Sequence, residues 1–452
     1  MKRHLAFFLL VLPLFCLHTL GSQPDSLGVA LAWRMDSLIG AHAALLEETQ
    51  LGLYVYDLTA DTALYAHGSR QRLRPASTQK LFTAVTALAK LGGDYRFRTT
   101  LSAVVDTLHC VDAEGPDTLL LKKLIVRGGM DPTLGANDLR AFAEAVRGLG
   151  NSQPMITPTE GVSLVCDLSF KDSLRWGEGW CWDDDETPLV PLLYGSSDTF
   201  SQQFSKALET PDRTGRCICK VGRIETSFIP VKVLNTKTSK GNGATLLMEH
   251  STHIDNVLFR MMKRSDNQYA ESLFYQLGRS GPKAAGVVKD LLKSIGADFS
   301  AVNVADGSGL SLYDYTTPEA LVLLLRHAWR TPQIYRHLQP SLPLAGHDGT
   351  LSGRMTEGPA RYNVMAKTGS VTGVSTLAGY ALADNGHMLA FAIMNQGVRK
   401  SAVGRAFQDE VCQALCAPLV KSAEAEEKNT EDTQGDPLPL PAESDDDIST
   451  EQ

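Results

Sequence analysis

Apolar residues recur along part of the chain at the spacing of a helix. Leu81, Val85 and Leu88 are three to four positions apart, and the run stops at Gly92. One face of a helix buries residues at this spacing, and glycine commonly ends such a run. The pattern therefore predicts a helix that opens near Ser77 and ends before residue 92.

Towards the C-terminal end, two apolar runs are separated by a short polar segment. An apolar run extends to Ala383, the pair Asn385 and Gly386 follows, and a second apolar run covers 388–394. Asn-Gly between two apolar runs is a strong signal for a two-residue hairpin. We therefore expect two paired strands of a sheet here.

Further strand-like segments lie in the first half of the chain. Residues 96–105, 117–126, 156–170 and 226–234 are rich in β-branched and other apolar residues. They fall within 94–247, a stretch long enough to form one or two small β-rich subdomains. The sequence thus predicts strands in two separate parts of the chain.

The predicted helix carries a candidate nucleophile. Ser77 and Lys80 are three positions apart, so they share one face of a helix and the lysine amine can reach the serine hydroxyl. A lysine takes a proton from serine only if burial or a nearby cation lowers its pKa, and Lys367 could supply that cation. The Ser77 backbone N–H at the helix start could form half of an oxyanion hole.

A second short motif, Ser265–Asn267, carries groups that suit proton transfer and amide binding. Ser265 and Asn267 are two positions apart, on an expected loop between helices, and could point into one cleft. Ser265 would pass protons between the lysines and the leaving group. Asn267 would hold a substrate amide through its side chain.

The third motif begins the strand before the predicted hairpin. Lys367 would attract a substrate carboxylate and Thr368 would hydrogen-bond it. Gly369 would allow the substrate to approach closely, and the Ser370 N–H would complete the oxyanion hole. An edge strand at this place could pair with an extended peptide.

The three motifs, in this order, resemble those of penicillin-interacting serine acyltransferases. Over nearly all of 25–420 the chain resembles the class C low-molecular-mass penicillin-binding proteins, the penicillin-binding protein 4 type of D-alanyl-D-alanine carboxypeptidase/endopeptidase. Other segments that carry this resemblance are Gly128–Gly135, Trp176–Asp184, Asp306–Ser311 with Thr317–Ala320, and Gly346–Leu351.

The resemblance implies an α/β fold and a chemistry. The fold is a transpeptidase or serine β-lactamase-like domain with an antiparallel sheet flanked by helices and a large β-rich insertion. Catalysis would pass through an acyl-enzyme on Ser77, on peptidoglycan peptides, with β-lactams as covalent inhibitors. It implies no metal and no organic cofactor. The sequence departs from the family pattern at Ser370 and Val371, where members often have Thr and Leu, and at Cys181, which lies inside the tryptophan-rich segment.

Motif spacing fits this subfamily. Ser265 follows Ser77 by 188 positions, whereas a minimal serine β-lactamase needs about a third of that distance. We therefore expect a discontinuous catalytic domain, 22–93 and 248–420, interrupted by an inserted segment, 94–247.

The N-terminal segment resembles a secretory signal peptide. Lys2 and Arg3 precede an apolar run, and small residues before Ser22 suit cleavage, so 1–21 is predicted to be removed on export. Cys16 raises a lipoprotein alternative, but the bulky Phe15 before it does not fit. We expect a periplasmic protein without a transmembrane anchor in the mature chain.

The net charge of −8 is concentrated in the last residues. The segment 421–452 holds eleven acidic residues and two lysines, which leaves 22–420 at −1. The acidic, proline-containing tail is predicted to be disordered. A body of nearly zero charge gives no support for nucleic-acid binding.

The cysteines give no clear pattern. Seven remain after signal-peptide removal, so at least one is unpaired, and Cys412 with Cys416 is a possible disulfide of awkward geometry. Cys217 and Cys219 lack a second ligand pair at metal-binding spacing.

Three function hypotheses follow: a D-Ala-D-Ala peptidase, a serine β-lactamase, and a catalytically silent envelope-binding protein. The large insertion argues against the second. The intact set of motif residues argues against the third.

Overall fold

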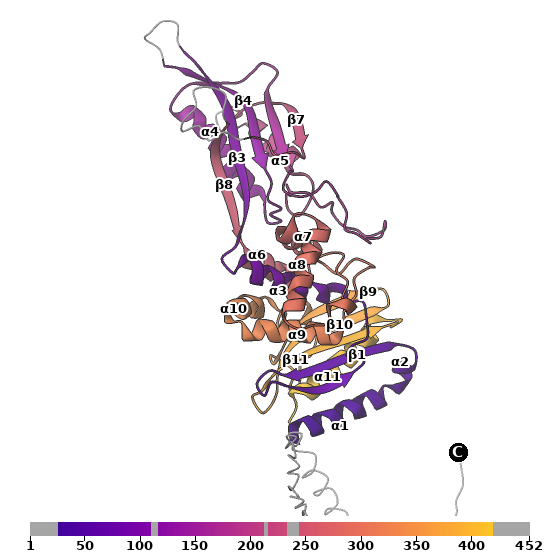
Figure 1. Ribbon diagram of the computed structural model, residues 1–452. Helices are drawn as coiled ribbons and strands as arrows, with labels where there is room; N and C mark the ends of the chain where they lie inside the picture. The colour runs from indigo at the N-terminus through magenta and orange to yellow at the C-terminus, as the bar shows by residue number, and fades with distance from the viewer. Residues whose placement is uncertain (1–25, 110–115, 212–215, 233–243, 419–452) are drawn as a thin grey trace, which may run out of the picture.

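The computed structural model describes residues 26–109, 116–211, 216–232 and 244–418. The predicted signal peptide and acidic tail lie outside these ranges. The described chain contains two sheets with helices between and around them (Figure 1).

The first sheet has five antiparallel strands. Their order is β2 (Thr62–His67), β1 (Gln50–Asp57), β11 (Met388–Gln396), β10 (Val374–Leu382) and β9 (Val364–Val371). The predicted pair of strands is confirmed, because Leu382 of β10 pairs with Met388 of β11. The turn is longer than the two residues predicted, since the Ala383 N–H donates to the His387 carbonyl, and Gly386 takes φ +82° within it. β9 is an edge strand. Residues 343–345 pair with its start, through Ala345 N–H to the Val364 carbonyl and Ala366 N–H to the Pro343 carbonyl, and from Lys367 onwards no described strand pairs with its outer side.

Helices cover both faces of this sheet. One face packs on α3 (Gln79–Leu91) and α9 (Pro318–Arg330), and the other on α1 (Ser26–Ala41) and α11 (Ser401–Cys416). Alternate residues of β11 enter the two cores, which is why its sequence is continuously apolar.

Further helices extend the core on the α3 side. They are α6 (Ile254–Lys263), α7 (Asn267–Gly278), α8 (Gly281–Ser294) and α10 (Pro332–Ser341). The short α2 (Ala43–Glu47) follows α1. Single 3₁₀ turns are η1 (Ala76–Thr78), η2 (Leu149–Asn151), η3 (Phe299–Ala301) and η4 (Gly349–Leu351).

The second sheet contains both parallel and antiparallel pairs. Its strands come from the part of the sequence between α3 and α6. Its order is β7 (Val221–Ser227), β6 (Val162–Asp167), β4 (Thr118–Arg127), β3 (Arg96–Leu108) and β8 (Ala244–His253), with the short β5 (Met155–Ile156) also paired to β4. Two helices, α4 (Ala136–Gly148) and α5 (Phe200–Glu209), pack on it through Phe142 and Phe204.

The two sheets lie at opposite ends of the described chain. In Figure 1 the second sheet is at the top and the first at the bottom, with α3, α6, α7 and α8 between them. The predicted α/β class, with an antiparallel sheet flanked by helices and a second β-rich part, is confirmed.

Some predicted strand limits are wrong. β7 ends at Ser227, so most of the predicted strand 226–234 is not a strand where it is described, and Pro230, which lacks a backbone N–H, lies in that part. Within the predicted strand 156–170, β6 covers only Val162–Asp167 and β5 ends at its first residue.

The limits of the inserted segment remain a proposal. The predicted boundary after residue 247 falls inside β8, which pairs with β3 as far as His253. We therefore propose that the inserted segment ends at His253.

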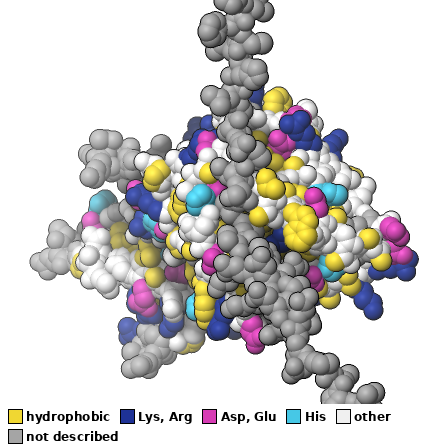
Figure 2. Space-filling model, turned by 90° about the horizontal axis from the view of Figure 1, so that it is seen from below, with side chains coloured by type: hydrophobic (Ala, Val, Ile, Leu, Met, Phe, Trp, Pro, Cys, Tyr) yellow, Lys and Arg dark blue, Asp and Glu magenta, His cyan; other side chains and the backbone are white. Residues whose placement is uncertain are grey.

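The surface agrees with the nearly zero charge of the body. On the face seen in Figure 2, acidic and basic side chains of the described residues are interspersed and do not form separate patches. Within the described ranges, no helix has both the length and the apolar character needed to cross a membrane.

Candidate active site

Ser77 lies in η1, the turn that precedes α3, and the backbone enters this turn in an uncommon conformation. Ala76 has φ +46°, a left-handed value that residues with a side chain rarely adopt. The hydroxyls of Thr78 and Thr376 each donate to the Pro75 carbonyl oxygen at 2.7 Å. Strained backbone of this kind persists only where neighbouring groups hold it. Two hydroxyls from different elements thus fix the turn that carries Ser77.

Gly309 supports the same turn by close approach. It has φ +83°, and a Cβ added to it would lie 1.9 Å from the Ala76 carbonyl oxygen. We expect Gly309→Ala to destabilise the protein by about 2 kcal/mol or more and to slow acylation of Ser77, because the turn must shift. Chemical denaturation and penicillin labelling measure both effects.

Gly373 provides a matched control for this substitution. It has φ +76° but no atom within 4 Å of an added Cβ. Gly373→Ala should therefore cost only backbone strain and leave labelling unchanged. Equal behaviour of the two variants would contradict the supporting role of Gly309.

The Lys80 amine lies at the centre of the site. Its side chain is 0 % exposed, and Nζ donates to Ser77 Oγ at 2.9 Å, Asn267 Oδ1 at 2.7 Å and the Ser308 carbonyl at 2.8 Å. Burial lowers the pKa of Lys80 to about 8, although nearby carboxylates, Asp306 foremost, oppose the shift. At pH 7 such an amine is neutral in about one molecule in ten, so it can accept the Ser77 proton.

A buried aspartate lies behind Lys80. The Asp306 carboxylate accepts N–H groups from the backbone of Ser308 at 3.0 Å, Gly309 at 2.6 Å and Ser311 at 2.8 Å, and from the indole of Trp180 at 2.8 Å. With the Ser308 hydroxyl, which donates at 3.1 Å, five donors fix this carboxylate in place. The two segments that hold Trp180 and Asp306 carried part of the sequence resemblance, and they contact each other here.

Two more buried acids surround this aspartate. Burial, with the charge of Asp306, raises the pKa of Glu271 and of Asp314 well above the usual range. Glu271 accepts the Gly307 N–H at 2.9 Å. The negative field of this cluster favours the charged form of Lys80, and burial of Lys80 favours the neutral form. No sequence pattern predicted the burial of Glu271 and Asp314.

Ser265 and Asn267 come from the junction between α6 and α7. Ser265 lies in the connecting loop with φ +58°, and Asn267 is the first residue of α7. The Lys367 amine donates to Ser265 Oγ at 2.8 Å and to the Thr368 carbonyl at 2.7 Å. Burial, with the charge of Lys80, lowers the pKa of Lys367 well below the usual range. Two serine–lysine pairs, one on each side of the site, are thus present.

β9 brings the third motif against the Ser77 turn. A Cβ added to Gly369 would lie 3.0 Å from the Ser77 backbone nitrogen, so only glycine allows this approach. Thr368 Oγ1 donates to Thr350 Oγ1 at 2.8 Å. Beside them lies a cavity of about 340 Å³, lined by Thr350, Gly353, Arg354, Thr368, Gly369, Ser370, Ser375 and Arg405.

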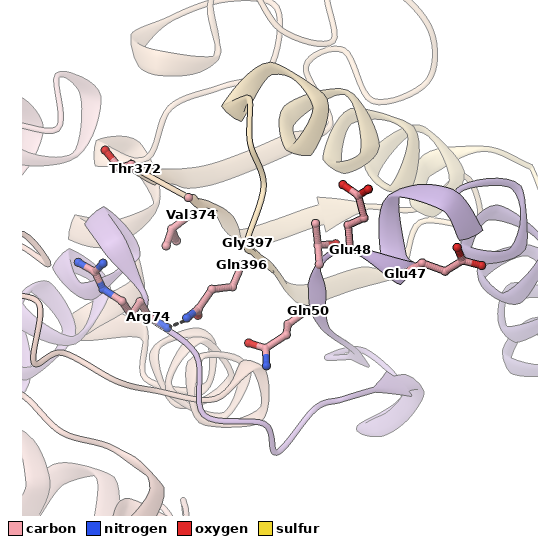
Figure 3. Close-up of a pocket in the computed structure, with 10 residues that line it drawn as sticks. Glu47, Glu48, Gln50, Arg74, Thr372, Val374, Gln396 and Gly397 are labelled. Carbon is pink, nitrogen blue, oxygen red and sulfur yellow. Dashed lines mark hydrogen bonds between the residues drawn. The ribbon is translucent and has the colours of Figure 1, made fainter.

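A second cavity, of about 560 Å³, lies at the tip of the β9–β10 hairpin (Figure 3). It is lined by Glu47, Glu48, Thr49, Gln50, Arg74, Thr372, Gly373, Val374, Gln396 and Gly397. The Arg74 backbone N–H donates to Gln396 Oε1 at 2.9 Å. This bond ties the segment that leads to Ser77 to the end of β11.

The structure joins the predicted site residues into one arrangement. Hydrogen bonds link Ser77, Lys80 and Asn267, and a second set links Ser265 and Lys367. The segment 368–370 lines the adjacent cavity.

The described cysteines form no disulfide in this structure. Cys412 and Cys416, the possible pair, are free and buried in the core. Among the described residues, no group of three or more His, Cys, Asp or Glu side chains is arranged to hold a metal ion.

Comparison with known proteins identifies the family. The model of the D-Ala-D-Ala carboxypeptidase 3 (S13) family matches residues 34–193 and 227–417. The chain belongs to this family. Its activity is therefore that of a D-Ala-D-Ala carboxypeptidase, as the sequence resemblance predicts.

Individual relatives of the S13 family agree. The chain is 28% identical to the D-alanyl-D-alanine carboxypeptidase of Actinomadura sp. (strain R39), with 86% of each chain covered. It is 32% identical to the penicillin-sensitive carboxypeptidase A of Dictyostelium discoideum, with 71% of this chain and 76% of the relative covered. Penicillin binding protein 4 of Haemophilus influenzae has the same fold, with a TM-score of 0.65 at 21% identity over 84% of this chain and 98% of that one.

Proposed function

We propose that the enzyme cleaves D-Ala-D-Ala ends and cross-links of peptidoglycan peptides through an acyl-enzyme on Ser77, and that penicillins acylate the same residue. The observation that carries the proposal is the position of the Lys80 amine, which is buried and hydrogen-bonded to both Ser77 and Asn267. A buried amine of lowered pKa beside a serine hydroxyl is an activated nucleophile pair.

Acylation would begin when neutral Lys80 takes the Ser77 proton and Oγ attacks the carbonyl of the penultimate D-Ala. The N–H groups of Ser77 and Ser370 would stabilise the oxyanion, a role supported by the contact of Gly369 with the Ser77 backbone. As the C–N bond breaks, the leaving amine needs a proton. Ser265, bonded to Lys367, would deliver it. The proton that Lys80 took from Ser77 would then pass to the Ser265–Lys367 pair, so that Ser265 regains its proton and Lys80 is neutral again.

Deacylation would use water as the second nucleophile. A basic amine at Lys80 would take a proton from water, hydroxide would attack the ester, and Ser77 would recover its proton as the ester C–O bond breaks. In a penicillin the leaving nitrogen stays tethered to the acyl group and obstructs water. A relative named as penicillin-sensitive supports this part of the proposal. The proposed steps use only side chains and backbone N–H groups of this chain.

The alternatives are a serine β-lactamase and a silent envelope-binding protein. A digest of purified muropeptides, followed by mass spectrometry, tests all three hypotheses. We expect monomers to lose one D-Ala and cross-linked dimers to be cleaved, because an edge strand that holds one D-Ala end can hold either substrate.

The controls distinguish the alternatives. Unchanged muropeptides with rapid turnover of penicillin would indicate a β-lactamase. Unchanged muropeptides without any penicillin labelling would indicate a silent protein. Loss of D-Ala without cleavage of dimers would contradict only the proposed endopeptidase activity and would leave the carboxypeptidase activity standing.

We also propose that the enzyme acts in the periplasm, where its substrate is found. The predicted signal peptide supports this location. N-terminal sequencing of exported protein should begin at Ser22, and a mature chain that retains residues 1–21 would contradict it.

A further inference from the structure

Glu186, a carboxylate of the inserted segment, contacts the catalytic centre. Its side chain is half-buried, and its Oε1 accepts a hydrogen bond from Asn267 Nδ2. The other end of the same amide, Asn267 Oδ1, accepts from Lys80 Nζ at 2.7 Å. The three side chains therefore form a hydrogen-bonded series that runs from the Glu186 carboxylate through the Asn267 amide to the Lys80 amine.

This hydrogen-bonded series fixes which way the Asn267 amide points. An amide has one acceptor and one donor end, and an ammonium or amine donor must meet the oxygen. With Glu186 accepting from the nitrogen end, a rotated amide would place its NH₂ against Lys80 and its oxygen against a carboxylate. Both contacts would be unfavourable. One N–H of the NH₂ group remains available for a substrate carbonyl.

Glu186 also contributes to the charge around Lys80. The titratable groups that face the Lys80 amine are Asp306, Glu271, Glu186, Asp266 and Lys367. Burial raises the pKa of Glu186 above its usual value, and the bond from Asn267 and the charge of Lys80 oppose this shift, while Asp266 and Asp184 add to it. Asp306 is held by four N–H donors, and Asp266 is paired with Arg260 at 2.9 Å. Glu186 is the member of this set that comes from the inserted segment and is linked to Lys80 through the amide.

We propose that Glu186 is a positioning residue of the active site, which orients the Asn267 amide and opposes the positive charge of Lys80. The proposal rests on the proposed roles of Ser77 and Lys80. It gives the inserted segment a part in catalysis, because the catalytic domain alone does not supply this carboxylate.

The pH dependence of acylation by labelled penicillin tests the charge. In the wild type, the second-order rate constant should rise with pH as Lys80 loses its proton, with a midpoint near the pKa of about 8. Glu186→Gln keeps an acceptor for Asn267 but removes a negative charge, so the Lys80 ammonium is less stabilised and its pKa falls. We expect the midpoint to move to lower pH by about half a unit or more, with a plateau within about twofold of the wild type.

Asp185→Asn is the matched control. Asp185 is exposed and adjacent in sequence, and its substitution removes the same charge. Its profile should coincide with that of the wild type. A Glu186→Gln midpoint that does not move, or that moves to higher pH, would overturn the proposal.

Glu186→Ala tests the orientation. It removes both the charge and the acceptor, so we expect the same midpoint shift and, in addition, a plateau lower by about tenfold. A plateau equal to that of Glu186→Gln would overturn the orienting role. Equal melting temperatures of the variants show that folding is intact. Failure of the proposed function would look different, since the wild type itself would then not be labelled at Ser77.

Discussion

Replacement of Ser77 by alanine is expected to abolish covalent labelling by penicillin and hydrolysis of D-Ala-D-Ala peptides. In the part of the chain that the structure describes, the Ser77 hydroxyl is the one hydroxyl bonded directly to the Lys80 amine. The fold should be retained, because Lys80 keeps its bonds to Asn267 and Ser308 when the Ser77 hydroxyl is removed. Intact-mass spectrometry of the penicillin-treated variant and its melting temperature measure the two results.

Lys80→Met should lose acylation almost as completely. The base and the nucleophile act as one unit, so removal of either removes nearly the whole effect. Lys90→Ala is a control on the same helix, since Lys90 is exposed in the last turn of α3 and should not affect labelling. Labelling of Ser77→Ala at another serine would show that the nucleophile is misassigned.

The elements set by local chemistry could be predicted from the sequence. The hairpin at Asn385 and Gly386 depends on a turn that only a few residue pairs favour, and it occurs where predicted, although its turn is longer than two residues. The helix after residue 77 follows from apolar spacing, although Ser77 itself lies in a 3₁₀ turn before the helix. That Ser77, Ser265 and Lys367 meet was predicted from motif order, and no local property of these segments encodes it.

Two of the acids around Lys80, Glu271 and Glu186, could not be predicted, because their burial depends on partners far along the chain. Glu271 is buried in α7, where the Gly307 N–H, 36 positions further on, bonds its carboxylate. Glu186 reaches Asn267 from an irregular segment with three neighbouring aspartates, a composition typical of a solvated loop. A sequence pattern indicates only that a carboxylate favours water. The positions of Glu271 and Glu186 depend instead on tertiary contacts, which the pattern does not contain.

Lys367→Ala is expected to slow all substrates and to impair those with a free terminal carboxylate most. A common loss should arise because Ser265 loses the amine that donates to it at 2.8 Å. A further loss should affect D-Ala-D-Ala peptides relative to their C-terminal amides if the predicted role of Lys367, attraction of the terminal carboxylate, is right. Lys367 is buried and does not itself line the cavity beside Thr368, where Arg354 and Arg405 supply the cations. A charge-assisted hydrogen bond contributes about 1.5–3 kcal/mol, or roughly ten- to a hundredfold in kcat/KM.

The pH dependence adds a second test of the same substitution. The two amines oppose each other's protonation, because the charge of Lys80 lowers the pKa of Lys367. Removal of Lys367 therefore takes away a positive charge near Lys80 in the molecules in which Lys367 is protonated. The Lys80 ammonium is then better tolerated, its pKa rises, and the acid limb of the kcat/KM profile should move to higher pH, opposite to the shift expected for Glu186→Gln. Lys293→Ala, an exposed lysine of α8, should change neither the substrate ratio nor the profile. Equal losses for the acid and amide substrates, together with the shifted profile, would assign Lys367 to proton transfer and to tuning Lys80, and would exclude it as the carboxylate-binding group.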